Sequence, residues 1–189
     1  KSEDKPGPQN VTLEYSNKFS LPKGSKQKGI RRLSGYEVRI MFVPGAEDPE
    51  YGDNVVLFQK RGVLKNILRQ GGNAGYMGFS FPDNLADAET PARKKQVALI
   101  QKTADKTGDG VPDVMIDYFS GGAHCCFSTY FVNLGPTAEV VEVINTDNAS
   151  LVATSVNPKG GLRFSTNENA FAYWNIFYAG SPMPEVVLE

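Results

Sequence analysis

The sequence predicts a mostly β protein, built from short antiparallel strands and not from long helices. Its 189 residues include 19 glycines and 12 prolines, and aromatic residues make up 11% of the chain. Glycine and proline favour turns, whereas aromatic residues favour strands. Short stretches that alternate apolar and polar residues recur between these turns, as half-buried strands require. We therefore expect antiparallel four-stranded meanders, assembled as a partial propeller-like structure or a sandwich.

The pattern divides the chain into three parts. Residues 1–10 are polar and proline-rich, and we expect them to be disordered. Residues 11–91 form a β-rich N-terminal region, and residues 92–189 form a β-meander region that contains an acidic loop. A chain of 189 residues suits one domain or two small ones, so the two regions can also form one continuous domain.

Strands are expected wherever β-forming residues alternate with polar ones between turn signals. In the N-terminal region these are 11–15, 36–42, 54–59 and 76–81, and 63–69 is either a strand or a short helix. In the second region they are 96–103, 114–119, 127–134, 139–144, 151–156, 162–166, 171–178 and 185–189. For 96–103, Thr90-Pro91 offers an alternative interpretation as a helix start. Four of these strands, from 96 to 144, are close enough in sequence to form one antiparallel meander.

A basic segment interrupts the N-terminal region. Residues 18–32 hold six basic and no acidic residues, together with Gly24 and Gly29. One interpretation is a solvated loop, and the other is a patch for an anionic polymer or a surface glycan. The whole chain has a formal net charge of −1, which gives it no general attraction to nucleic acid or to an anionic membrane. No apolar run approaches the ~20 residues that a membrane-spanning helix needs.

The acidic loop, residues 105–113, is the clearest candidate for an ion site. The expected ligands are Asp105, Thr107, Asp109 and Asp113 through side-chain oxygens and Val111 through its backbone carbonyl. Calcium prefers six to eight oxygen ligands, and alternate residues of one loop can point inward to supply them. Gly110 permits the sharp turn that such a loop makes. The alternative is a surface turn made of good turn formers.

The loop differs from an EF-hand. Ile116 stands where that motif has a bidentate glutamate, and an apolar alternating segment follows in place of a helix. The reduced ligand set predicts weak binding of one structural Ca²⁺, on the order of 10⁻⁴ to 10⁻³ M, as in extracellular modules. Such a site fills outside the cytoplasm and stays empty inside it.

Two features carry a resemblance to known proteins. An apolar segment, the loop sequence DKTGDGVPD and a second apolar segment together resemble the calcium loop of FG-GAP and VCBS repeats, as in integrin α-subunit propellers. The resemblance covers about residues 97–134, is faint over 151–188 and is absent from the first 90 residues, and Thr107 departs from it. It implies a structural ion between the first two strands of a four-stranded blade. The segment 120–126 is similar to one that follows such loops in uncharacterised bacterial exported proteins, and no activity carries over from them.

His124, Cys125 and Cys126 are the only histidine and cysteines of the chain. Adjacent cysteines have Cα atoms about 3.8 Å apart, so a vicinal disulfide is strained. Such a disulfide nevertheless suits an exported protein whose cysteines have no other partner in the chain. Reduced buried thiols, pairing between molecules and a metal site remain alternatives. As a base, His124 has poor geometry beside a thiol on the opposite face of a strand, and a site from Ser120, His124 and Asp117 lacks a nucleophile-elbow signature.

We therefore expect an exported bacterial protein, periplasmic or secreted, that acts as a non-catalytic binding or envelope-associated module. The start of the chain at Lys1, without a hydrophobic leader, is compatible with a removed export signal. A glycan or another envelope protein is the expected partner. The alternative is a hydrolase or thiol-dependent enzyme that uses the segment from His124 to Cys126, with Asp117 as a neighbour. The aromatic run around Trp174 is either core or a platform for a glycan.

Overall fold

The computed structural model describes residues 11–13, 19–70, 75–80, 88–120, 127–147, 149–168 and 181–188. The predicted disorder of residues 1–10, the predicted strand at 171–178 and the His124–Cys126 segment lie outside these ranges. The predictions made for them are therefore not compared with the fold.

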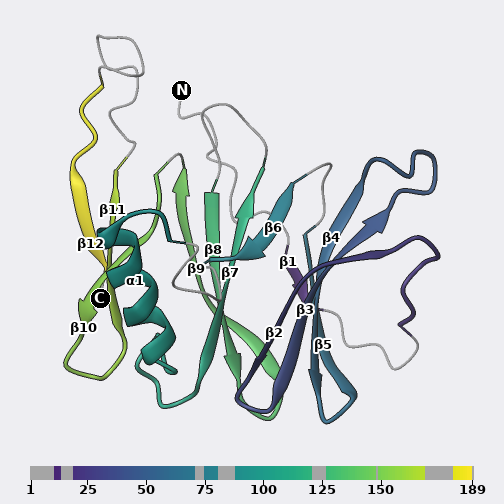
Figure 1. Ribbon diagram of the computed structural model, residues 1–189, viewed down its shortest axis with the longest axis horizontal. Helices are drawn as coiled ribbons and strands as arrows, with labels where there is room; N and C mark the ends of the chain where they lie inside the picture. The colour runs from purple at the N-terminus through teal and green to yellow at the C-terminus, as the bar shows by residue number, and fades with distance from the viewer. Residues whose placement is uncertain are drawn as a thin grey trace, which may run out of the picture.

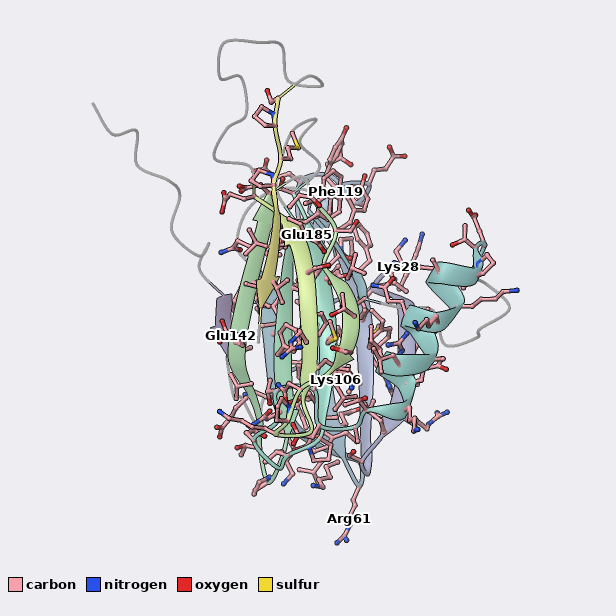
Figure 2. All side chains as sticks on the ribbon, turned by 90° about the vertical axis from the view of Figure 1, so that its left-hand side faces the viewer. Lys28, Arg61, Lys106, Phe119, Glu142 and Glu185 are labelled. Atoms are coloured by element: carbon pink, nitrogen blue, oxygen red, sulfur yellow. The ribbon has the colours of Figure 1, made fainter. Side chains whose placement is uncertain are left out.

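The fold consists of three antiparallel sheets that pack against one another as successive layers (Figure 1). The first has the order β1-β5-β4-β3-β2, from β1 (Val11–Leu13), β2 (Lys26–Leu33), β3 (Tyr36–Pro44), β4 (Gly52–Lys60) and β5 (Val63–Gln70). The second has the order β6-β7-β8-β9, from β6 (Tyr76–Phe79), β7 (Asp113–Phe119), β8 (Phe127–Leu134) and β9 (Ala138–Asp147). The third has the order β10-β11-β12, from β10 (Val152–Val156), β11 (Leu162–Asn167) and β12 (Glu185–Leu188). Helix α1 (Pro91–Lys102) lies beside the third sheet, and in the side view it stands to one side of the strands (Figure 2).

The four-stranded sheet is the central layer and contributes to a hydrophobic core on each of its faces. One face packs against the five-stranded sheet through residues such as Val38, Phe58 and Ile116. The other face packs against α1 and the three-stranded sheet through a second core, which includes Phe131 and Phe164. A third cluster lies on the outer face of the five-stranded sheet, where Phe19 and Leu21 pack against it. The predicted mostly β class and four-stranded meander are confirmed, with sheets layered as in a sandwich.

One predicted strand is wrong. Residues 96–103 belong to α1 and its C-terminal cap, which is the helix alternative that Thr90-Pro91 offered. The Thr90 hydroxyl accepts a hydrogen bond from the Arg93 N–H at 3.2 Å, and Pro91 occupies the first turn. A side-chain oxygen at the N-cap and a proline just inside are strong helix starts. The first strand of the meander is instead β6, which pairs with β7.

Most of the second half of the basic segment is not the solvated loop that one interpretation predicted. Residues 26–33 form β2, an edge strand that pairs with β3, and not a loop. Lysines on an edge strand discourage pairing with other chains, which gives part of the basic run a structural reason. The segment 63–69, for which the sequence allowed either a strand or a helix, is strand β5.

Among the described residues, the helical structure consists of α1. No helix there combines the length and the apolar character that crossing a bilayer requires.

Candidate functional site

The acidic loop joins α1 to β7 and docks on the turn between β10 and β11. The Leu162 N–H donates to the Lys106 carbonyl at 2.7 Å. Gly161 lies so close to the loop that a Cβ there would stand 2.7 Å from the Gly108 nitrogen and 2.8 Å from the Thr107 carbonyl carbon. The Asn157–Gly161 turn, which lacks carboxylates, therefore supports the acidic loop by close backbone packing.

Asp105 organises the N-terminal half of the loop. Its Oδ1 accepts the Gly108 N–H at 2.6 Å and the Asp109 N–H at 3.3 Å, and its Oδ2 accepts the Gly110 N–H at 2.7 Å. Gly108 and Gly110 have φ values of 80° and 92°, a conformation that glycine adopts without strain. The carboxylate thus holds the turn that the two glycines permit.

Asp113 closes the loop from the first residue of β7. It is fully buried, and its Oδ2 accepts the Lys106 and Thr107 N–H groups at 2.8 and 3.0 Å and the Thr107 hydroxyl at 3.1 Å. Burial raises the pKa of this carboxyl, and the bonds from Thr107 and Lys106 oppose that shift. Asp113 Oδ1 is buried and makes no hydrogen bond. A buried carboxylate oxygen with no partner is costly, so this atom can accept a ligand.

The structure brings together three of the five predicted ligands. The Thr107 hydroxyl lies 3.5 Å from Asp105 Oδ1 and 3.1 Å from Asp113 Oδ2, so the two carboxylates meet at this group. Asp109 also interacts with the Thr107 side chain, but its hydrogen bonds lead away from the other two carboxylates: its Oδ1 accepts the Val111 N–H at 2.8 Å, and its Oδ2 accepts the amide of Asn133 on β8 at 2.7 Å. These bonds lower the pKa of the Asp109 carboxyl.

The donor set fits a hard cation in part. Asp105, Thr107 and Asp113 supply converging oxygens of the kind calcium prefers. Within the described ranges, no three His, Cys, Asp or Glu side chains lie close enough together to hold a metal ion. A cation would therefore be held by two carboxylates, one hydroxyl and backbone carbonyls.

Lys106 is the feature of the loop that sequence analysis missed. Its side chain is only 7% exposed, and its ammonium donates to the carbonyls of Thr103, Ala104 and Asp113 at 3.1, 3.3 and 2.8 Å. Burial lowers the pKa of Lys106 to about 8, while the charges of Asp113 and Asp105 act in the opposite direction. The ammonium is an internal cation that offsets part of the charge of the loop.

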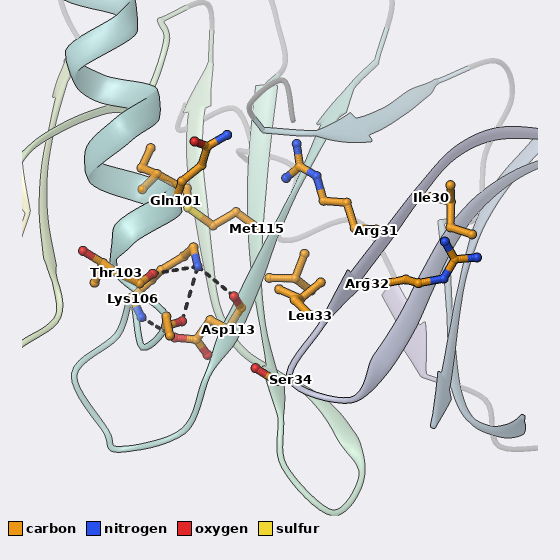
Figure 3. A pocket seen from close by; sticks show the side chains of 13 residues that line it. Ile30, Arg31, Arg32, Leu33, Ser34, Gln101, Thr103, Lys106, Asp113 and Met115 are labelled. Atoms are coloured by element: carbon orange, nitrogen blue, oxygen red, sulfur yellow. Dashed lines mark hydrogen bonds between the residues drawn. The ribbon is translucent and has the colours of Figure 1, made fainter. Parts of the chain in front are cut away.

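A pocket of about 440 Å³ lies beside this ammonium, between β2, the end of α1 and the start of β7 (Figure 3). Its polar side chains include Arg31, Gln101 and Lys106. Arg31 stacks over the Phe79 ring at 4.3 Å, and the Arg32 guanidinium pairs with Glu37 at 2.9 Å. These contacts fix the side chains of two arginines of the basic segment. The acidic loop forms one wall of the pocket through Lys106 and Asp113.

A second carboxylate, Asp117, lies on the same face of β7. Its Oδ1 accepts the hydroxyls of Ser80 and Thr129 at 2.7 and 2.6 Å. Burial raises its pKa, and these two hydrogen bonds together with the charges of Arg93 and Arg31 act against that shift. The sequence identified Asp117 only as a neighbour of His124, which lies outside the described residues along with Cys125 and Cys126.

No protein-family model, curated protein or solved structure matches this chain. The resemblance to FG-GAP and VCBS repeats stays a prediction, and the interpretation of the site depends on its own geometry.

Proposed function

We propose that this protein is a non-catalytic binding module in which the loop from Asp105 to Asp113 holds a structural calcium ion. The observation that carries the proposal is the buried, unpartnered Asp113 Oδ1, in a carboxylate that meets Asp105 across the Thr107 hydroxyl. A divalent cation would give this oxygen a partner and remove the repulsion between the two carboxylates. Asp105, Thr107 and Asp113 would hold it, together with backbone carbonyls.

The ion would stabilise the fold and would take no part in a chemical reaction. The loop supports α1 on one side and the β10–β11 turn on the other, so its order fixes how the central and third sheets meet. Because the Lys106 ammonium already supplies one positive charge, the affinity for calcium is weak. A weak site fills at the millimolar calcium concentrations outside cells, which agrees with an exported, periplasmic or secreted protein.

Thermal unfolding in calcium and in chelator tests the proposal. With a dissociation constant of about 0.1–1 mM, 10 mM calcium stabilises the fold by about 1.4–2.7 kcal/mol. For a chain of this size, the expected rise in Tm is roughly 3–10 °C. Asp105→Asn and Asp113→Asn abolish the difference between calcium and chelator. Asp53→Asn, at an exposed position of β4, retains it. An unchanged Tm of the unsubstituted protein at 10 mM calcium would exclude a structural calcium ion.

A further inference from the structure

A small cavity lies beside Asp117, whose partner on the neighbouring strand is a glycine. Across the central sheet, Gly78 pairs with Asp117, and Asp117 pairs with Thr129. Paired residues project to the same face of a sheet. A Cβ added at Gly78 would meet no atom of the described residues within 4 Å. Among these residues, the row Gly78–Asp117–Thr129 therefore has space beside the carboxylate.

This cavity has a volume of about 210 Å³. Its polar side chains come from Ser80, Arg93, Asp117, Thr129, Thr146 and Ser150, and its apolar side chains come from Met115, Phe127, Ala149 and Leu151. Sites for drug-sized ligands typically measure roughly 300–1,000 Å³. The volume therefore suits one small ring or a group of that size, with polar atoms on one side and apolar atoms on the other.

The hydrogen-bonding groups are already oriented for a ligand that carries hydroxyls. Both hydrogen bonds to Asp117 from the described part of the chain end on Oδ1, which leaves Oδ2 to accept a ligand hydroxyl. Ser80 and Thr129 use their protons on this carboxylate, so their oxygens can still accept further hydrogen bonds. Arg93 also lines the cavity, and its guanidinium donates to the Gln96 side-chain carbonyl at 3.4 Å.

A row of aromatic rings crosses the same face of the sheet, one step from the cavity. Tyr76, Phe119 and Phe127 are directly paired across β6, β7 and β8. The ring centroids are 6.5 Å and 4.4 Å apart, and the interplanar angles are 20° and 19°. Tyr76 is 68% exposed, and Phe127, which also lines the cavity, is 36% exposed. The row continues the apolar side of the cavity outward to the edge strand.

We infer that this cavity binds one sugar ring of a neutral oligosaccharide, with adjacent rings of the glycan lying along the aromatic row. A sugar ring presents hydroxyls that both donate and accept, and it also presents apolar C–H surfaces that pack on aromatic rings. Two guanidinium groups, from Arg93 and Arg31, exert their charges on Asp117, which disfavours a cationic ligand. Glycoside hydrolysis ordinarily needs a pair of carboxylates, and Asp117 is the one carboxylate among the described residues that line the cavity.

The inference gives a ligand class to the proposed binding module. Its test is calorimetric titration of the whole chain with cellohexaose, maltohexaose and xylohexaose, in 10 mM calcium. We expect at least one of the three to bind and to remain intact on incubation with the protein. Asp117→Asn and Gly78→Val each weaken that binding at least about tenfold, because the first removes the charged acceptor and the second places a side chain beside Asp117 on the same face of the sheet. Because valine favours strands, the Gly78→Val variant is expected to fold, so its loss of binding can be measured.

Two exposed tyrosines provide a matched pair. Tyr76 and Tyr51 are 68% and 66% exposed, but Tyr51 directly precedes β4 of the five-stranded sheet and is not a member of the aromatic row. Tyr76→Ala weakens binding about fivefold through lost packing, whereas Tyr51→Ala leaves it unchanged.

Three results would overturn the inference: no binding of any of the three sugars up to 10 mM, binding that Asp117→Asn and Gly78→Val leave intact, or binding of putrescine in place of the sugars. A sugar that binds and is cleaved would instead contradict a non-catalytic module. The calcium proposal is judged separately by the Tm difference between calcium and chelator, so either proposal can fail alone.

Discussion

Asp113 and Asp117 lie four residues apart on the same face of β7, and burial raises the pKa of both carboxyl groups. Their partners differ. Asp113 accepts two backbone N–H groups and a threonine hydroxyl, next to the buried ammonium of Lys106. Asp117 accepts two side-chain hydroxyls and lines a cavity. Each carboxylate keeps one oxygen without a hydrogen bond from the described residues. The difference is that Asp113 is enclosed in the acidic loop, where its free oxygen suits an ion, whereas Asp117 lines a cavity that a larger ligand can enter.

The two ends of β7 accordingly serve the fold in different ways. At its N-terminal end the acidic loop, α1 and the β10–β11 turn are joined by backbone contacts. Toward its C-terminal end, the described residues leave space next to Gly78, the partner of Asp117, and the aromatic rings of Tyr76 and Phe127 are exposed. We therefore expect substitutions at the first end to change stability and substitutions at the second end to change binding.

The largest expected effect is that of Asp113→Ala. This change leaves two buried N–H groups without an acceptor and removes the negative charge closest to the Lys106 ammonium, so it should destabilise the fold by about 3–5 kcal/mol. Urea unfolding at neutral pH measures the loss. A loss of unfolding free energy below about 1 kcal/mol would mean that the hydrogen bonds and charge of Asp113 do not stabilise the fold.

Gly161→Ala probes the contact between the loop and its supporting turn. The added Cβ would stand 2.7 Å from the Gly108 nitrogen, so the backbone must shift at a cost of about 1–3 kcal/mol. Gly78→Ala is the matched control, because its Cβ would meet no atom of the described residues within 4 Å, and its stability should stay within about 0.5 kcal/mol of the unsubstituted protein. Equal effects of the two changes in urea unfolding would contradict the docking of the loop on this turn.

Asp117→Asn should change stability in a pH-dependent way. The folded-state pKa of Asp117 is raised, so its contribution to stability is present below the unfolded pKa of about 3.9 and is lost as the pH rises through the folded pKa. An asparagine side chain does not ionise, so the variant does not lose stability in this way. The stability of the variant relative to the unsubstituted protein should therefore rise between pH 4 and pH 7. Urea unfolding at both pH values measures the gain, and a stability difference that is the same at both contradicts the assignment.

The smallest expected effect on stability is that of Tyr76→Ala, at an exposed edge-strand position. Loss of one ring contact should cost about 0.5 kcal/mol or slightly more. A larger loss in thermal unfolding would show that the aromatic row supports the sheet and is not mainly a binding surface.

Much of the fold could be predicted because its strands have clear alternation and clear turns. The predicted 127–134 coincides with β8, and the predicted 114–119 lies within β7. The segment 96–103 was harder, because a short apolar run suits a strand or a buried helix equally well. Here the Thr90 cap and Pro91 decide the outcome locally. The edge strand β2 was missed because it is rich in lysine and arginine, which are not strong strand formers.

The candidate site was only partly predictable. The spacing of Asp105, Thr107 and Asp113 led to three groups that meet in space. It could not reveal that Lys106 turns inward as a buried cation, because side-chain direction in a loop depends on what packs over it. The cavity at Asp117 combines residues far apart in the sequence, such as Ser80 and Thr129, which become neighbours of Asp117 only through the fold.

The most direct test of the central claim is a calcium titration followed through the backbone amide resonances of the uniformly labelled protein. We predict saturable shifts with a midpoint of about 0.1–1 mM, concentrated in residues 105–113, where the amides of Gly108, Gly110 and Thr107 donate to the two carboxylates. The same titration of Asp113→Asn should leave these resonances unchanged. Shifts that are absent, or that occur only outside the loop, would contradict a calcium site between Asp105 and Asp113.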